Sequence, residues 1–327
     1  MKSLHIGVFN PTLIYTASPY CGDEVFAKGF EKNGFDVIRF DYRASADCNT
    51  ELQNISININ PDVVWLGKCE RLTEETIISL RNKFKDAIFC SWAADVRDTP
   101  TTHDLAKCRH IDYFFGTFGG DYLRAHLTTN MRLVCSILAF TDSDFYKKYE
   151  ITPEFESDVL WTGHRCSGDN SLRNQVIDYL SVDKYRSDHR RHVNVLGLNE
   201  WLGYPEYNKY MTGAKIGIGV NSFKRTKYSS DRLGNYLATG TFFLTEKIEG
   251  LAACFRDGVH VDSFSTVEEM NSKVNYYLTH DDEREGIARE GQKLVLDCFD
   301  CKPLVKNILH IINTGQSLYD WDDLYTT

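Results

Sequence analysis

Short apolar runs recur along the chain, and each is followed by a stretch with helical spacing. In the first half they cover residues 4–9, 37–40, 63–66, 88–91, 113–117 and 134–138, and in the second half 159–162, 193–196, 216–220, 241–244 and, more weakly, 260–262. Several runs are apolar through most of their length, which is typical of strands covered by helices on both faces. The alternation predicts an α/β protein with parallel sheets and crossover connections.

The stretches between these runs carry helix signals of their own. Residues 172–180 and 233–237 place apolar side chains at helical spacing, and Gly240 stands where a helix C-cap is expected. Thr266 and Glu269 have the spacing of a capping box, which predicts a helix to about residue 278. Two further helices are expected over about 281–299 and 302–313.

The strand rhythm breaks between residues 139 and 158. That stretch is polar and aromatic and contains Pro153, so we interpret it as a connection between domains. A length of 327 residues, at roughly 150 residues per domain, fits two domains. We therefore predict two Rossmann-like domains that face each other across a cleft, residues 1–145 and residues 157–300, with a C-terminal helix and tail at 301–327.

Composition narrows the class of protein. The chain is 42% hydrophobic, and its formal net charge of -9 disfavours general nucleic-acid binding, which depends on neutralising phosphates. No apolar run reaches the roughly 18 residues of a membrane span, and residues 1–9 resemble a first strand rather than a signal peptide. Ten cysteines are too sparse for a disulfide scaffold, so we expect reduced thiols and a cytoplasmic protein. Cys298 and Cys301 form a lone CxxC, and we predict no metal site.

The segment 227–245 carries the most chemical information. Small polar residues at 229–231 run into a helical pattern that ends near Gly240, and a strand pattern follows. A helix that begins near Ser229 would direct free backbone N–H groups and its positive dipole end toward a cleft, with Lys227 and Arg232 beside them. Such a group suits a diphosphate. The alternative is a plain capped helix with solvated charges.

A longer pattern surrounds this segment. Ser230-Asp-Arg-Leu-Gly-Asn-Tyr-Leu-Ala-Thr-Gly240 is followed by Phe242-Phe-Leu-Thr245, Gly250-Leu251 and Phe255-Arg-Asp-Gly258. This pattern resembles the C-terminal domain of the spore-maturation-protein-like glycosyltransferases, a branch of the group-1 enzymes with the GT-B fold. Residues 158–163 are similar to the strand and turn that open that domain, and the resemblance extends to about residue 299.

The resemblance implies transfer of a sugar from a nucleotide-sugar donor, of UDP type, to an acceptor hydroxyl. It also implies a retaining reaction without a metal or other cofactor. Residues 157–300 would bind the donor and residues 1–145 the acceptor, while residues 301–327 would pack back on the first domain. One position departs from the family: Asn235 replaces a glutamate expected to bind the ribose, and Lys227 replaces a second glutamate of the wider group. An amide still forms hydrogen bonds but carries no charge.

We predict donor contacts from three loops of the second domain. They are Gly163, His164 and Arg165, then Asn221 and Ser222, and then Ser229, Ser230, Asp231 and Asn235. Arg232 and Lys227 are the candidate catalytic cations, because a departing diphosphate develops negative charge. In the first domain, loops 10–23 and 91–98 should face the cleft, and Asp95 is the candidate to orient or deprotonate the acceptor. The alternatives are ordinary turns, polar loops and a surface carboxylate.

Two other functions remain open at this point. A sugar-nucleotide epimerase could use the same architecture, and a non-catalytic nucleotide-sugar-binding module would explain the departure at Asn235. The acceptor is also open. A local basic set, made of Lys224, Arg225 and Lys227 with Arg186, Arg190 and Arg191, either lies in solvated loops and near donor phosphates or favours a polyanionic acceptor such as nucleic acid or polysaccharide.

Overall fold

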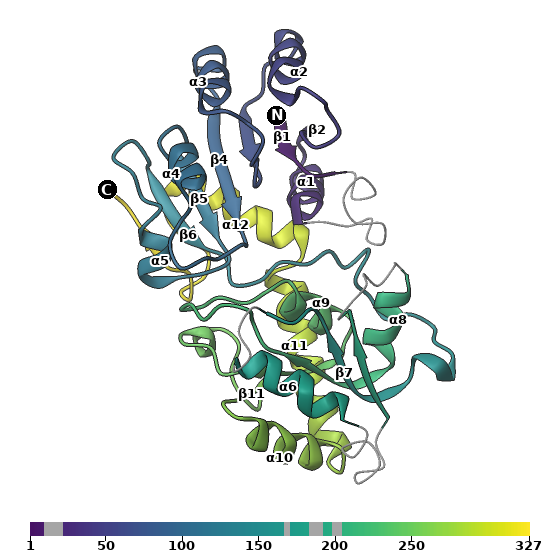
Figure 1. Ribbon diagram of the computed structural model, residues 1–327. Helices are drawn as coiled ribbons and strands as arrows, with labels where there is room; N and C mark the ends of the chain where they lie inside the picture. Colours follow the sequence, from purple (N-terminus) through teal and green to yellow (C-terminus); the bar gives the residue numbers. More distant parts are fainter. Residues whose placement is uncertain (10–21, 167–170, 183–191, 198–204) are drawn as a thin grey trace.

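The computed structural model describes residues 1–9, 22–166, 171–182, 192–197 and 205–327, and these form two α/β lobes (Figure 1). The N-terminal lobe is built on a seven-stranded sheet in the order β12-β6-β5-β4-β3-β1-β2. Its strands are β1 (Lys2–Gly7), β2 (Asp36–Asp41), β3 (Val63–Leu66), β4 (Ile88–Ala93), β5 (Tyr113–Gly116), β6 (Leu133–Ser136) and β12 (Leu324–Tyr325). All pair in parallel except β12, which runs antiparallel to β6.

Helices cover both faces of this sheet. They are α1 (Gly22–Lys32), α2 (Cys48–Ile55), α3 (Glu74–Lys83), α4 (Thr102–Cys108) and α5 (Gly120–Arg124), with a short 3-10 turn at Ser56–Asn58. α1 shares one face with α12 (Cys301–Thr314), whose apolar side packs on Phe26 and Phe30. The helices α2 to α5 cover the other face. The near-continuous apolar strands therefore become buried on both sides, as their pattern predicts.

The C-terminal lobe has a five-stranded parallel sheet in the order β11-β10-β9-β7-β8. Its strands are β7 (Ser157–Thr162), β8 (Val193–Leu196), β9 (Ala214–Gly219), β10 (Phe242–Glu246) and β11 (Asp262–Phe264). Its helices are α6 (Leu172–Ser181), α8 (Glu206–Gly213), α9 (Arg232–Ala238), α10 (Val267–Tyr277) and α11 (Asp281–Cys298), with 3-10 turns at Pro153–Phe155 and Leu251–Ala253. Two apolar cores lie on its two faces. The prediction of two Rossmann-like domains with parallel sheets is confirmed.

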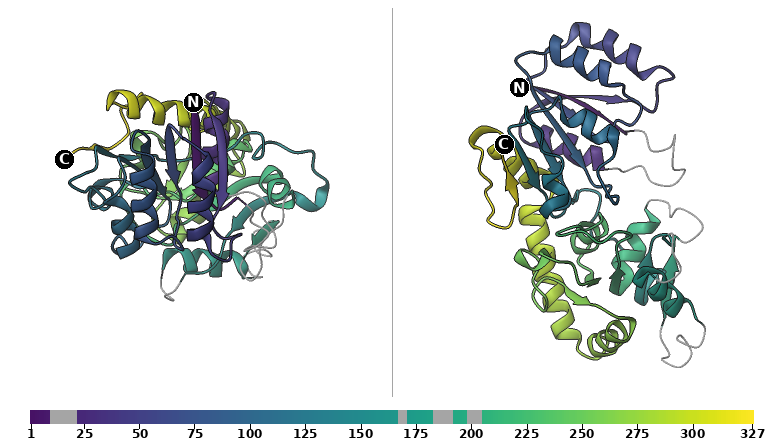
Figure 2. Two further views of the ribbon diagram at one scale, coloured as in Figure 1. Left: turned by 90° about the horizontal axis from the view of Figure 1, so that it is seen from above. Right: turned by 60° about the vertical axis from the view of Figure 1, so that its left-hand side comes forward.

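The chain crosses between the lobes twice, and the two crossings lie side by side. Thr141 pairs with Asp300 in an isolated bridge, and the Thr141 N–H donates to the Phe299 carbonyl at 3.0 Å. After the second crossing, α12 and the tail lie against the N-terminal lobe (Figure 2). The strand β12 is a feature that the sequence pattern did not predict, since it has only two residues. None of the helices in the described part of the chain is long and apolar enough to cross a bilayer.

Candidate functional site

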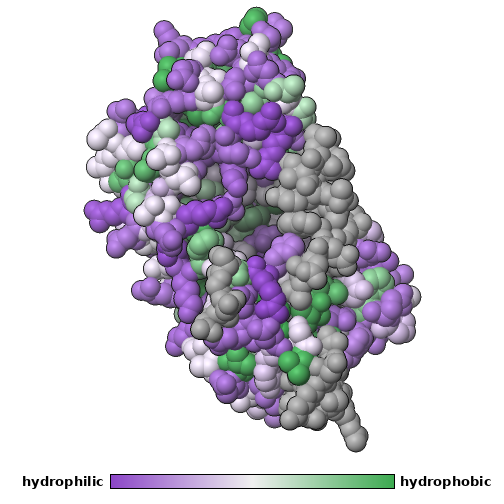
Figure 3. All heavy atoms as spheres, in the orientation of Figure 1, coloured by the Kyte–Doolittle hydropathy of each residue, from purple (hydrophilic) through white to green (hydrophobic). Residues whose placement is uncertain are grey.

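A cavity of about 970 Å³ lies between the two lobes, at the carboxyl ends of both sheets. Val8, Asp23 and Trp92 line it from the N-terminal lobe. Gly163 and Gly197, which follow β7 and β8, line it from the C-terminal lobe. A hollow between the lobes is visible in the space-filling view (Figure 3). Ligands of open parallel sheets bind at this edge, so the cavity is the natural place for a substrate.

Arg232, the first residue of α9, is almost fully buried and lines this cavity. Its guanidinium donates to the Thr162 carbonyl at 3.0 Å and to the Val220 carbonyl at 2.9 Å, and its Nε donates to Ser230 Oγ at 3.0 Å. These carbonyls lie at the ends of β7 and β9. The predicted cation is therefore fixed at the sheet edge by neutral acceptors.

A second buried guanidinium lies beside it. Arg173, in the first turn of α6, donates from Nε to the His164 carbonyl at 2.6 Å and from its Nη1 atom to the Val220 carbonyl. Burial and the neighbouring charge of Arg232 lower the pKa of Arg173 to about 9. Sequence reasoning missed this residue, because a charged side chain next to the apolar stripe of a helix is usually solvent-exposed. The available signal was the place of Arg173 in the first helix after the Gly163 turn.

Neither guanidinium has a carboxylate partner among the described residues, where the ion pairs within 4.0 Å involve other side chains. Both instead lie over the indole of Trp161, at 5.1 Å for Arg173 and 5.7 Å for Arg232. The carboxylates of Glu246 and Asp231 act on these charges from beyond that distance. Two adjacent buried cations without a direct carboxylate contact are costly unless an anion completes the site. The arrangement therefore favours a doubly charged ligand group such as a diphosphate.

Gly163 makes this pair of arginines possible. Its φ of +123° lies in a region that L side chains rarely adopt, and a Cβ there would lie 2.7 Å from Arg173 Nη2 and 3.3 Å from Arg232 Nη1. The glycine turn was expected to let another group approach the backbone closely. In the structure, the groups that approach Gly163 are the two arginine side chains. His164 and Arg165 also line the cavity, and Arg165 forms an ion pair with the exposed Asp178.

The helix start differs from the prediction. α9 begins at Arg232 rather than near Ser229 and has seven residues. The Ser230 N–H is taken by Asn221 Oδ1 at 3.1 Å, and the Ser229 hydroxyl donates to the Ser230 carbonyl at 3.2 Å. Because a turn contact already uses the Ser230 N–H, this one of the three predicted amides is taken by Asn221.

Asp231 and Asn235 lie on the cavity wall one helical turn apart. Asn235 is buried, and its amide donates to Asp231 Oδ2 at 3.5 Å. Asp231 itself is open to the cavity, and enclosure within the cleft raises the pKa of its carboxyl. The amide and the carboxyl thus present adjacent hydrogen-bonding groups to a ligand held by the arginines.

Asn221 and Ser222 have different surroundings. Asn221 accepts from Ser230 and donates to the Tyr228 carbonyl at 3.1 Å, so it shapes the loop, and it lines a smaller cavity of about 680 Å³ rather than the large one. Ser222 lines the large cavity. Tyr228 borders both cavities and packs on the core of the N-terminal lobe.

The structure places Lys227 away from the large cavity. Its ammonium donates to the Trp321 carbonyl at 2.7 Å and to Asp323 Oδ1 at 2.6 Å, in the C-terminal tail. Lys227 does not line the large cavity. The expected diphosphate contact of Lys227 is therefore corrected: a partner 96 residues away in the sequence takes its charge.

The N-terminal wall offers carboxylates. Asp95 lines the cavity, as loop 91–98 predicts, and its carboxylate lies 2.6 Å from the Lys68 ammonium with 58% of its side chain exposed. Asp23, which ends the predicted loop 10–23 and lies in the first turn of α1, lines the cavity as a buried residue. The rest of that loop, 10–21, lies outside the described residues.

The described members of the basic set predicted for a polyanionic acceptor have separate partners. Arg225 donates to the Arg97 carbonyl at 2.6 Å and lies 3.6 Å from Asp98. Its side chain therefore forms a contact between the two lobes. Lys224 borders the smaller cavity. Arg186, Arg190 and Arg191 lie outside the described residues. The described members of the set therefore give no support to a polyanionic acceptor.

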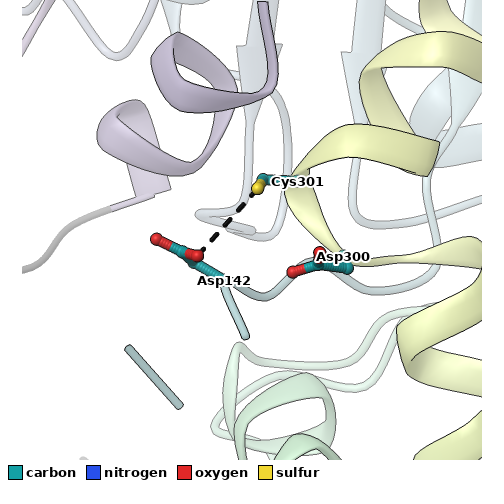
Figure 4. Close-up of side chains that lie close together, drawn as sticks. All are labelled: Asp142, Asp300 and Cys301. Atoms are coloured by element: carbon teal, nitrogen blue, oxygen red, sulfur yellow. Dashed lines mark hydrogen bonds between the residues drawn. The ribbon is translucent and has the colours of Figure 1, made fainter. Parts of the chain in front are cut away.

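One cluster of possible metal ligands lies where the two interlobe crossings meet. Its members are Asp142, Asp300 and Cys301, whose ligand atoms lie within 4.8 Å of one another (Figure 4). The Asp142 carboxylate is buried and lies 2.7 Å from the Lys28 ammonium and 4.0 Å from that of Lys32. Asp300 accepts from the Ser143 N–H at 2.7 Å. Lysines of α1 thus balance the negative charge of Asp142. We interpret the cluster as a structural contact that stabilises the two interlobe crossings.

Comparisons with known structures define the architecture. The Anabaena HepE structure in complex with UDP-glucose shares 11% identity, with a TM-score of 0.61 over 96% of this chain and 100% of that one. Sucrose-phosphate synthase of Thermosynechococcus elongatus shares 10% identity, with a TM-score of 0.61 over 96% and 99% of the two chains. The fold is GT-B. Residues 177–310 of this GT-B chain match a family model described as glycosyl transferase-like.

Another enzyme class shares this architecture. A Listeria monocytogenes protein assigned as a UDP-N-acetylglucosamine 2-epimerase also matches, with 11% identity and a TM-score of 0.55 over 96% of both chains. No curated protein sequence is significantly similar to this chain. The narrower resemblance to spore-maturation-protein-like enzymes stays a prediction.

Proposed function

We propose that this protein is a glycosyltransferase that moves a sugar from a UDP-type nucleotide donor to an acceptor hydroxyl. The observation that carries the proposal is the pair of buried guanidiniums of Arg173 and Arg232 on the wall of the interlobe cavity, with no described carboxylate oxygen within 4.0 Å of either. The glycosyl transferase-like match over residues 177–310 and the UDP-glucose complex of HepE support the nature of the donor.

The two arginines act on the leaving group. As the bond between the anomeric carbon and the diphosphate oxygen breaks, negative charge grows on the diphosphate, and cations held in place before the reaction stabilise it without reorganisation. Backbone carbonyl oxygens at the edge of the sheet hold both guanidiniums in place. The orientation of their remaining N–H groups is therefore fixed as well. This is the task that a divalent cation performs in other transferases, and we propose a reaction without a metal. Retention of the anomeric configuration rests on the family resemblance.

The remaining predicted residues surround this centre. Asp231 and Asn235 would bind the ribose, with the carboxyl one turn earlier supplying the charge that an amide lacks. Gly163, His164, Arg165, Ser222 and Ser230 would border the donor. On the opposite wall, Asp95 would orient an acceptor hydroxyl. The acceptor itself is a compound that enters from the N-terminal lobe.

Binding of UDP to purified variants tests the proposal. UDP and UDP-glucose should raise the melting temperature of the wild-type protein, since a ligand that binds only the folded state stabilises it. Arg232→Gln and Arg173→Gln should each weaken UDP binding by about 10- to 100-fold, because each removes charge-assisted hydrogen bonds. Arg289→Gln, which removes an exposed helix cation, is the control. Full UDP affinity in both cavity variants would refute the diphosphate site.

The epimerase alternative keeps a specific observation in its favour, namely the Listeria structure with the same fold. It makes a distinct prediction. An epimerase would convert UDP-N-acetylglucosamine without any acceptor and would exchange the hydrogen at the epimerised carbon with deuterium from D₂O. A glycosyltransferase releases UDP and leaves that hydrogen in place.

A further inference from the structure

Glu246 is a buried carboxylate at the same sheet edge as the arginine pair. It is the last residue of β10, which pairs with β9, and only 3% of the residue is exposed. Its Oε1 accepts from the Asn221 N–H at 2.5 Å. No cation of the described residues lies within 4.0 Å of this carboxylate. Because a buried charge is costly without a partner of opposite sign, its charge must be balanced from farther away.

The peptide group between Val220 and Asn221 connects this carboxylate to the arginines. Its N–H, on Asn221, donates to Glu246. Its carbonyl, on Val220, accepts from Arg173 Nη1 and, at 2.9 Å, from Arg232 Nη2. A carbonyl oxygen has two lone pairs, so it can serve both guanidiniums. One planar group therefore has the acid at its N–H and both cations at its oxygen.

The polarity of this peptide group matches its neighbours. A carboxylate at the N–H polarises the amide and increases the negative charge on its oxygen, which strengthens the bonds from both guanidiniums. Burial raises the pKa of the Glu246 carboxyl, whereas the nearby charges of Arg232 and Arg173 favour its ionised form. The exposed Lys224 acts in the same direction. The acid and the two buried cations therefore stabilise one another without direct contact.

The separation between acid and cations has a consequence for the ligand. A carboxylate in direct contact would occupy guanidinium N–H groups and would compete with a diphosphate for them. Glu246 leaves such groups open, since Arg173 Nη2 forms no hydrogen bond in the described part of the chain. Glu246 borders the smaller cavity and not the large one, so its effect on a ligand in the large cavity is electrostatic.

We propose that Glu246 is a positioning residue, the counter-ion that balances Arg173 and Arg232 through the Val220–Asn221 peptide group. The inference rests on the proposed function. In the free protein, the negative charge of Glu246 offsets the repulsion between the two guanidiniums. In the complex, the diphosphate supplies negative charge of its own, so the carboxylate opposes it and favours the release of UDP after transfer. Two fixed cations can then bind a leaving group that must also depart.

The test is Glu246→Gln, whose side-chain carbonyl can still accept from the Asn221 N–H, so the change removes the charge and keeps an acceptor. The melting temperature of the free protein should fall by about 2–6 °C, because two buried cations lose their counter-ion. UDP affinity, measured by isothermal titration, should rise by about 3- to 30-fold, because the diphosphate no longer meets a like charge. A purely structural role would lower both quantities.

Asp262→Asn is the matched control, since it removes another buried carboxylate of the same sheet, one paired with Lys273. It should lower the melting temperature and leave UDP affinity unchanged. Unchanged or weaker UDP binding in Glu246→Gln overturns the proposal.

A double-variant cycle tests the same coupling without UDP. Glu246→Gln should cost less stability in an Arg173→Gln protein than in the wild type, since one of the two cations is already gone. Asp262→Asn should cost the same in both. Equal losses for Glu246→Gln in both proteins overturn the proposal. If Glu246→Gln alone does not fold, the double variant should fold, and its failure to fold also overturns the proposal. Wild-type protein that binds no UDP refutes the proposed function, whereas the cycle still decides the role of Glu246 in the free protein.

Discussion

A buried guanidinium normally contacts a carboxylate directly, and the two beside Gly163 have no described carboxylate oxygen within 4.0 Å. Arg173 and Arg232 share the Val220 carbonyl instead, which holds the two like charges together on one strand end. Their mutual repulsion is a cost that the free protein carries, and an anionic ligand removes it. Under the proposed function, the affinity for a diphosphate therefore comes from the geometry of these two side chains rather than from a helix terminus.

Gly163 offers a test at this scale. Gly163→Ala places a methyl group 2.7 Å from Arg173 Nη2 on a backbone with φ +123°, so it should displace the guanidinium and weaken UDP binding about tenfold, with about 1–3 kcal/mol of lost stability. Gly258→Ala is a matched control, since it has φ +69° and open space around its Cβ. Isothermal titration with UDP and chemical denaturation measure the two effects. Equal UDP affinity in both variants would contradict the proposed packing.

At the scale of elements, the loop between β9 and α9 and the C-terminal tail join the lobes. The Gly119 N–H donates to the Thr226 carbonyl at 2.8 Å, and Phe223 packs on the core of the N-terminal lobe. Asp323 accepts from Lys227 and also from the Gly120 N–H at 3.0 Å. The loop that shapes the donor site is therefore tied to the lobe that would hold the acceptor.

Lys227→Met tests whether that residue belongs to the tail or to the donor site. The change leaves the partly buried Asp323 without its cation, so we expect a loss of about 1.5–3 kcal/mol in unfolding free energy and unchanged UDP affinity. Lys215→Met, which breaks an exposed pair with Asp158, should cost less than about 1 kcal/mol. Denaturant unfolding and UDP titration measure both quantities. Weaker UDP binding in Lys227→Met would restore its place at the diphosphate.

At the scale of the molecule, the two interlobe crossings are fastened together. Asp142 from the first crossing lies against Lys28 of α1, and Asp300 from the second accepts from Ser143. A Cβ on Gly29 would overlap the Cys301 carbonyl, so α1 and α12 approach closely at this point. The relative position of the lobes, and with it the width of the cavity, depends on this region.

Asp142→Asn should destabilise the whole protein, because it leaves the Lys28 charge beside a buried amide. We expect the free energy of unfolding to fall by about 3–5 kcal/mol, the range for breaking a buried pair. The value should lie near the lower limit, because the Lys28 side chain is partly exposed. Asp178→Asn, which removes an exposed carboxylate paired with the exposed Arg165, is the control. Thermal and denaturant unfolding provide the measurement. If added EDTA or Mg²⁺ shifts the wild-type melting temperature, the cluster binds a cation and the structural interpretation fails.

The sequence by itself determined the elements and the class of fold. Apolar runs of four to six residues, alternating with helical spacing, have few stable solutions other than parallel sheets covered by helices on both faces. The same local pattern placed Arg232, Ser230 and Asn235 at the start of one helix, since their spacing is short-range. Gly163 and Ser222 follow strand ends that the sequence marks, whereas Arg232 and Asn235 lie in the first turn of α9.

Only the tertiary structure decided what these charges contact. Arg232 binds a carbonyl 70 residues away, Trp92 donates to a carboxylate 69 residues away, and Lys227 pairs with a residue 96 positions along the chain. Polar contacts of this kind depend on how the sheets stack and where the crossings lie, and a local pattern contains no information on either. That is why only the folded molecule showed Arg173 at the cavity and Lys227 paired with the C-terminal tail.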